Sequence, residues 1–213
     1  CVASQQQLRR LNLSFGNKLD SAFLIQLSNI PHLAKSLTSL QLDYMSDMFD
    51  LQSLAAIGKL ENLKSLSLRG LKFSVQKRLD ATDSNSTKKD PGQNQKPPKK
   101  PANSTTTSLR ASLESMLSQL KHLERLDLAD MEFAENMDAQ GARHVSKAIA
   151  KSAPTLTHLV LDQMFGLKDR HLKRIARKCP RLCALSLRKC SQLTDESICF
   201  FLNQAKRFQK VEF

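Results

Sequence analysis

The feature that most constrains this chain is the leucine pattern Leu-x-x-Leu-x-Leu, which recurs along almost its whole length. Six copies are complete: Leu8-Leu11-Leu13, Leu37-Leu40-Leu42, Leu63-Leu66-Leu68, Leu123-Leu126-Leu128, Leu156-Leu159-Leu161 and Leu182-Leu185-Leu187. A seventh begins as Phe208-Val211-Phe213. Successive copies start 29, 26, 60, 33, 26 and 26 residues apart, so the pattern predicts an array of similar units.

Each copy has the alternation of a short strand, because two leucines one residue apart point to the same face. Parallel stacking of such strands buries the leucines in a shared core, which contributes roughly 1.5–3 kcal/mol per side chain. Apolar residues then follow at helical spacing: Leu109, Leu113, Met116, Leu117, Leu120; Leu172, Ile175, Ala176, Cys179; Ile198, Phe201, Leu202, Ala205. We therefore predict an α/β fold, a right-handed leucine-rich-repeat solenoid (horseshoe) with parallel strands on the concave side and helices on the convex side.

Several residues mark where the helices and strands are expected to begin and end. Asp169 and Asp195 stand at predicted helix starts, where a carboxylate can cap free N–H groups. Pro154 and Pro180 are expected to end helices before the next strand. We interpret Pro31-His32-Leu33 as an approach to a strand.

The whole chain, 1–213, is predicted to form one solenoid of about six repeats plus a truncated seventh, within a longer protein. The 60-residue spacing contains one unit plus an insertion at 74–108. This insertion is rich in Lys, Pro, Ser, Thr and Asn, and it carries seven basic and three acidic residues. We expect a disordered basic loop between the strand and the helix of the third repeat.

The stretch Cys179-Pro180-Arg181-Leu182-Cys183-Ala184-Leu185-Ser186-Leu187-Arg188-Lys189-Cys190-Ser191-Gln192-Leu193-Thr194-Asp195 resembles the cysteine-containing leucine-rich repeat. That repeat is typical of F-box/leucine-rich-repeat proteins of the ribonuclease-inhibitor-like type. The resemblance implies a substrate receptor of a cullin-RING ubiquitin ligase. It further implies a ligase adaptor bound through an upstream region and a protein substrate bound on the concave face. Two alternatives remain: a repeat scaffold unconnected with ubiquitin, and a nucleic-acid-associated protein.

The concave face is the predicted partner-binding surface, because side chains beside the strand leucines point away from the core. The candidate residues are Arg10, Asn12, Gln41, Asp43, Ser67, Arg69, Arg125, Asp127, His158, Val160, Asp162, Ser186 and Arg188. They are mixed in charge and include no aromatic residue.

The formal charge of +13 is unevenly placed. Residues 168–189 hold nine basic side chains and one acidic side chain. The basic patch comprises Lys168, Arg170, Lys173, Arg174, Arg177, Lys178 and Arg181, on the helix side opposite the apolar stripe. It is either a solvated convex face or a surface for nucleic acid, acidic protein or anionic lipid.

Other site types find little support in the sequence. Five histidines are scattered, no Gly-rich phosphate loop is present, and no catalytic constellation or cofactor is predicted. The cysteines Cys179, Cys183, Cys190 and Cys199 take different roles in the repeat, so we predict no metal site. An odd cysteine count indicates a reducing compartment, cytoplasmic and/or nuclear. No apolar run is long enough to span a membrane.

Overall fold

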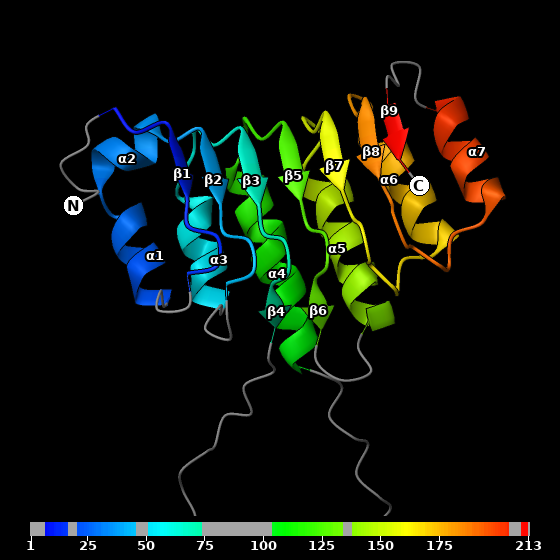
Figure 1. Cartoon of the computed structure of the whole chain (residues 1–213), viewed down its shortest axis with the longest axis horizontal. Coiled ribbons are helices and arrows are strands. Elements are labelled where there is room, and N and C mark those ends of the chain that lie inside the picture. Colours follow the sequence, from blue (N-terminus) through cyan, green and yellow to red (C-terminus); the bar gives the residue numbers. More distant parts are fainter. Residues whose placement is uncertain are drawn as a thin grey trace, which may run out of the picture.

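The computed structural model describes residues 7–16, 21–45, 51–73, 104–133, 138–204 and 210–212. Within these residues, seven short strands form one parallel sheet, in the order β1-β2-β3-β5-β7-β8-β9 (Figure 1). Their bounds are β1 Arg10–Asn12, β2 Ser39–Gln41, β3 Ser65–Ser67, β5 Arg125–Asp127, β7 His158–Val160, β8 Ala184–Ser186 and β9 Lys210–Glu212. A smaller parallel pair joins β4 (Lys72–Phe73) to β6 (Glu132–Phe133).

The helices form a second layer behind the sheet in Figure 1. Their bounds are α1 Ser21–Ser28, α2 Pro31–Ser36, α3 Leu51–Gly58, α4 Ser104–Gln119, α5 Asp138–Ser152, α6 Asp169–Lys178 and α7 Asp195–Gln204. Strand, turn and helix alternate along the chain, and the sheet stays open at both edges. The predicted α/β leucine-rich-repeat solenoid is confirmed.

The strand leucines form the spine of the core, as their spacing predicts. Leu40, Leu66, Leu126, Leu159 and Leu185 pair in one register across neighbouring strands, and each is at most 2% exposed. The helices add the other wall of the core with their apolar stripes, which include Leu113, Met116, Leu117, Leu172 and Ile175. The opposite side of the sheet has no helix against it in Figure 1, and we call it the open sheet face.

A row of left-handed turn residues follows the strands. Phe15, Tyr44, Gly70, Asp130, Gln163 and Lys189 all have φ between 53° and 66°, and each comes two residues after the last leucine of its copy. The ladder is extended by the N–H groups of Phe15, Tyr44, Gly70, Asp130 and Gln163: Phe15, for example, donates to the Asp43 carbonyl (2.8 Å) and Tyr44 to the Arg69 carbonyl (2.7 Å). The inter-repeat hydrogen bonds therefore offset a backbone conformation that costs about 1–2 kcal/mol in a residue with a side chain.

Three expectations about segments need correction. Pro31-His32-Leu33 begins helix α2 rather than a strand approach, since Pro fits the first turn of a helix and Leu33 packs in the core. Helix α4 begins at Ser104, so residues 104–108 of the predicted 74–108 loop are helical. The predicted disorder of residues 74–103 lies outside the described residues, as do Phe208, Phe213 and Ala205.

Two predicted side-chain roles are also wrong. Asp169 is the first residue of α6, but its carboxylate accepts hydrogen bonds from the backbone N–H (2.9 Å) and hydroxyl (2.7 Å) of Thr194 in the next repeat. It therefore links two repeats rather than capping its own helix. Leu202 is 44% exposed, because α7 turns Phe201 toward the core instead. Helices α5 and α6 end at Ser152 and Lys178, before Pro154 and Pro180 as expected.

We expect Leu159→Ala to lower the free energy of unfolding by about 2–5 kcal/mol, because it leaves a cavity in the leucine spine. Urea denaturation followed by circular dichroism measures the change. Leu202→Ala is the matched control, since its side chain is largely solvated, and it should cost less than about 1 kcal/mol. Equal losses for both variants would contradict the assignment of the core.

Candidate functional site

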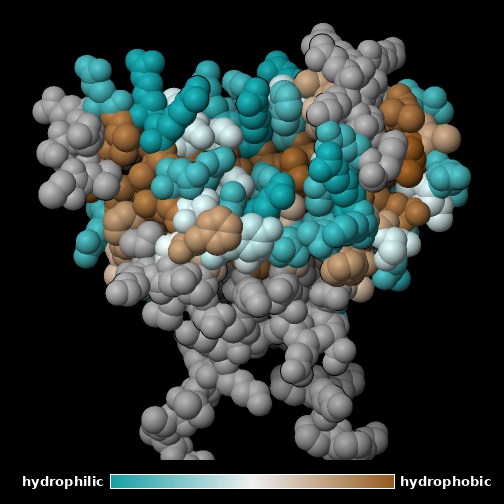
Figure 2. Space-filling view, in the orientation of Figure 1, coloured by the Kyte–Doolittle hydropathy of each residue, from teal (hydrophilic) through white to brown (hydrophobic). Residues whose placement is uncertain are grey.

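The open sheet face collects all the strand residues that the sequence marks as a partner surface. Arg10, Asn12, Gln41, Arg125 and Arg188 are exposed; Asp43, Arg69, Asp127, His158 and Val160 are half-buried; Ser67, Asp162 and Ser186 are buried. Hydrophilic side chains cover much of the upper part of the view in Figure 2, where the strands lie, with apolar ones between them. The expectation that all these side chains point into solvent is therefore wrong for the buried three.

The buried residues of this face form hydrogen bonds between repeats. Asp162 accepts from the Ser186 hydroxyl (2.6 Å) and from the backbone N–H of Arg188 (2.8 Å). Asp43 is bonded in the same way, by the hydroxyl of Ser67 and by the backbone N–H of Arg69. These carboxylates stabilise the junctions of the solenoid, so they are poorly placed to bind a partner.

Two arginines of the face are likewise engaged. Arg69 donates from Nη2 to Asp127 at 2.8 Å, and Arg188 donates from Nη2 to Glu212 at 2.6 Å. The hydrogen bond to Asp127 raises the pKa of Arg69 above its ordinary value despite partial burial. Both arginines follow a Ser-Leu pair, so the same sequence builds the same bridge twice.

The side chains of Arg10 and Arg125 remain exposed, and they form no hydrogen bond or ion pair with the residues that the structure describes. Next to Arg125 in the register lies His158, whose pKa is lowered by burial and by the positive charge of Arg125. The neighbouring Thr157 hydroxyl lies 2.8 Å from His158 Nδ1. This part of the face is therefore available to a partner and carries positive charge at neutral pH.

Sequence reasoning missed an aromatic pair at the carboxyl-terminal border of the face. Phe15 and Tyr44 belong to the left-handed row and stack with ring centroids 5.2 Å apart at an interplanar angle of 12°. They are 68% and 38% exposed. Gly70 continues the row, and a side chain there would meet the Tyr44 ring, since an added Cβ would overlap Cδ1. Aligning the copies at the second residue after the last leucine would have found the pair.

The basic patch covers helix α6 and residues on both sides of it, from Lys168 before the helix to Arg181 after it, and its members differ in their surroundings. Lys168, Arg170, Arg177, Lys178 and Arg181 are exposed, and the Arg177 guanidinium lies 5.0 Å from the Phe200 ring centroid. Lys173 pairs with Glu196 at 2.6 Å, and Arg174 donates to the Ser146 hydroxyl at 3.3 Å. Part of the charge therefore serves contacts with α5 and α7.

His171 lies buried beneath this patch. The backbone N–H of Lys168 donates to Nδ1 at 3.1 Å, and the Nε–H of Arg170 lies 3.2 Å from Nε2, so hydrogen-bond donors face both ring nitrogens. Burial, and then the charges of Arg170, Arg174, Lys168 and Arg143, lower the pKa of His171 to about 4. A cationic ring is disfavoured here, because all of these charged neighbours are basic.

Cys179 and Cys190 take structural positions, whereas Cys199 is exposed. Cys179 is buried and its thiol lies 3.7 Å from the Ala153 carbonyl, while burial raises its pKa to about 12. Cys190 lies 3.2 Å from the Leu161 carbonyl, and burial likewise raises its pKa. Within the described residues, no three His, Cys, Asp or Glu side chains gather in a way that could hold a metal ion.

Across the described ranges, none of the helices combines the length and the apolar character that crossing a bilayer requires.

Comparisons with known proteins add little to this geometry. No family model matches the chain, and no curated protein matches it. Among solved structures, it is similar to internalin C2 from Listeria monocytogenes (16% identity, TM-score 0.41, covering 89% of this chain and 66% of that one). It is also similar to the Rad7–Elc1 complex of yeast (16% identity, TM-score 0.36, covering 99% of this chain and 59% of that one). Likenesses this distant carry no argument about function.

His171 gives a pH prediction. Its folded pKa of about 4 lies below the ordinary 6.5, so the unfolded chain binds the extra proton between these values. Stability should therefore fall as pH is lowered from 6.5 to 4, and this residue should contribute about 3 kcal/mol of the loss. His171→Asn should make the fall shallower in urea melts at pH 7, 5.5 and 4. His122→Asn, at an exposed position, is the control, and an unchanged slope in His171→Asn would contradict the assignment.

Proposed function

We propose that this chain is a protein-interaction scaffold that binds a partner protein on the open sheet face. The observation that carries the proposal is the stacked Phe15–Tyr44 pair, held exposed on a rigid left-handed turn. Aromatic side chains dominate the binding energy of protein interfaces when a partner desolvates them. Arg10, near the opposite end of the same strand, supplies an exposed guanidinium for a polar rim.

The backbone around the pair is pre-organised. Phe15 and Tyr44 each donate a backbone hydrogen bond to the next repeat. The carboxylate of Asp43, which directly precedes Tyr44, accepts hydrogen bonds from Ser67 and Arg69. A surface already held in its binding conformation loses little entropy on association. This rigidity favours a binding role over a purely structural role for rings that are exposed to water.

We further propose that the scaffold is the substrate-recognition region of an F-box-type ubiquitin ligase receptor, acting in the cytoplasm or nucleus. The support is the cysteine-type stretch, in which Cys179, Cys190 and Thr194 all bond to the preceding repeat. Such a receptor would hold its adaptor through a segment other than these repeats. The alternatives are a scaffold unconnected with ubiquitin and a nucleic-acid-associated protein acting through 168–189.

The partner surface is tested by Phe15→Asn with Tyr44→Asn, because Asn tolerates the left-handed conformation and only the rings are lost. Affinity purification of the full-length protein from its own cells, read by mass spectrometry, should recover the main protein partner at least ten-fold less well. Leu202→Asn removes an exposed apolar side chain on α7 and should leave recovery unchanged. Unchanged recovery with the double variant would refute a role for the aromatic pair.

The ligase assignment is tested in the same purification of the unaltered protein, washed at low and at high salt. A cullin and its adaptor should remain after the high-salt wash. Their absence alongside retained protein partners would support the scaffold unconnected with ubiquitin. Recovery of nucleic acid alone, lost at high salt, would favour the basic patch, since phosphate contacts weaken steeply with salt.

A further inference from the structure

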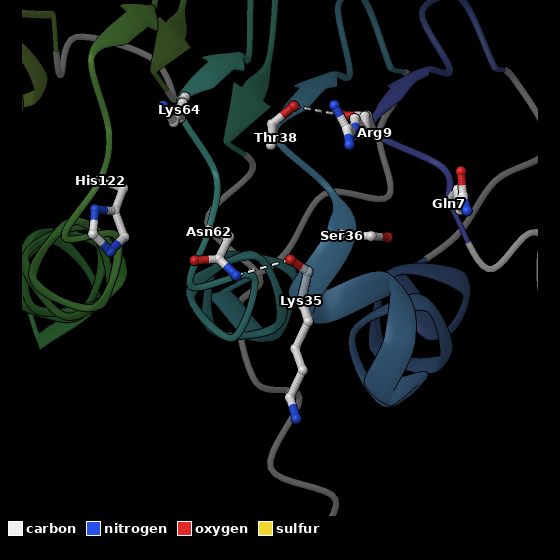
Figure 3. Close-up of a pocket in the computed structure, with 8 residues that line it drawn as sticks. All are labelled: Gln7, Arg9, Lys35, Ser36, Thr38, Asn62, Lys64 and His122. Atoms are coloured by element: carbon white, nitrogen blue, oxygen red, sulfur yellow. Dashed lines mark hydrogen bonds between the residues drawn. The ribbon is translucent and has the colours of Figure 1, made fainter.

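A hollow of about 700 Å³ lies at the edge of the solenoid where the strands begin (Figure 3). Its lining comes from the end of helix α2 and from the loops that precede β1, β2, β3 and β5: Gln7, Arg9, Lys35, Ser36, Thr38, Asn62, Lys64 and His122. None of these residues belongs to the open sheet face or to the basic patch.

Hydrogen bonds between successive repeats build the wall of the hollow. The Ser36 hydroxyl donates to the Leu8 carbonyl (2.9 Å), and the Thr38 hydroxyl donates to the Arg9 carbonyl (3.0 Å). Asn62 donates from Nδ2 to the Lys35 carbonyl at 2.8 Å, and Figure 3 shows this bond and that of Thr38. The loops are therefore fixed to one another before any ligand arrives.

The lining is positively charged and lacks a counter-charge of its own. Arg9 and Lys35 are exposed, and within the described residues their side chains make no ion pair. Lys64 lies 3.7 Å from Glu124, but both side chains are at least half exposed, so water screens the pair strongly. No carboxylate lines the hollow, whereas the amides of Asn62 and Gln7 offer acceptor oxygens beside the cations.

The spacing of the cations follows from the strand register. Arg9, Thr38, Lys64 and Glu124 directly precede paired residues of β1, β2, β3 and β5. Arg9 and Lys64 are therefore two strand spacings apart, about 9.6 Å at their Cα atoms. In an extended polyproline-II segment, residues i and i+3 lie on the same side and are about 9.3 Å apart.

We propose that this hollow binds an extended acidic segment of a partner protein, with Asp or Glu at positions i and i+3 facing Arg9 and Lys64. The amide oxygens of Asn62 and Gln7 accept backbone N–H groups of that segment. A protein ligand fits better than a nucleic acid, because no Phe, Tyr or Trp lines the hollow to stack on bases. The inference rests on the proposed function and deepens it, since it gives the chemistry of one partner segment.

The test is fluorescence anisotropy with the full-length protein and a labelled ten-residue peptide that carries Glu at i and i+3. A second peptide carries Gln at those positions. The Glu peptide should bind at 50 mM salt and the Gln peptide at least ten-fold more weakly. Arg9→Glu with Lys64→Glu should also weaken the Glu peptide at least ten-fold, and the milder Arg9→Gln with Lys64→Gln should act in the same direction.

The matched control is Arg143→Glu with Lys189→Glu, which changes the net charge equally at exposed positions on α5 and after β8. It should weaken binding less than two-fold. Equal weakening by both charge reversals would show attraction by net charge alone and would overturn the site. Equal binding of the Gln peptide would overturn it too, as would a single-stranded oligonucleotide that binds more tightly than the Glu peptide and depends on Arg9 and Lys64.

The outcome is separable from that of the proposed function. Phe15→Asn with Tyr44→Asn should leave peptide binding unchanged, because the pair lies at the other end of the strands. Loss of peptide binding in that variant would overturn a separate site in the hollow. If the aromatic pair captures a partner but the Glu peptide does not bind, the proposal for the hollow is refuted and the proposed function stands.

Discussion

The structure depends on a backbone ladder that continues past each strand into the turn. Three-residue strands offer few hydrogen bonds, and the ladder gains more from the N–H of the left-handed residue, as in Phe15 to Asp43 and Tyr44 to Arg69. The left-handed row is thus a requirement of the stacking, whichever side chain occupies it. Gly70 meets that requirement without strain, whereas Phe15 and Tyr44 meet it while presenting aromatic rings to solvent.

The repeat spacing predicts the register and the buried leucines, because every copy must place its leucines in one shared core. Alternation in the strand also separates core from non-core residues. Alternation does not predict that Ser67, Asp162 and Ser186 are buried, since their burial depends on hydrogen bonds between side chains of different copies. The sequence does not predict that α4 begins at Ser104, because the stretch is rich in Ser and Thr, which have low helix propensity. The packing of Leu113 and Met116 in the core overrides that propensity.

The sequence predicts more of the open sheet face than of the hollow. Arg10 and Arg125 follow from strand alternation, and they are exposed. Phe15 and Tyr44 can be found in the sequence only by aligning the turn residues of successive copies, because the residues around them follow no periodic pattern. The hollow joins residues from the end of α2 and from loops of different repeats, from Gln7 to His122, so only the stacked repeats bring its cations together.

The side-chain bridges near the carboxyl ends of the strands fall into two groups. Ser14, Asp43, Ser67, Arg69 and Asp127 connect β1 through β5, and Asp162, Ser186, Arg188 and Glu212 connect β7 through β9. Between β5 and β7, the facing positions are held by Arg125 with His158, Asp127 with Val160, and Ala129 with Asp162. Side-chain hydrogen bonds cross this junction only where the strands begin, from the hydroxyls of Thr155 and Thr157 to the carbonyls of Leu123 and Glu124; at the carboxyl ends of β5 and β7, the described residues are joined by backbone bonds. A partner that presses on the carboxyl ends of the strands would therefore meet the fewest side-chain bridges between the fourth and fifth repeats.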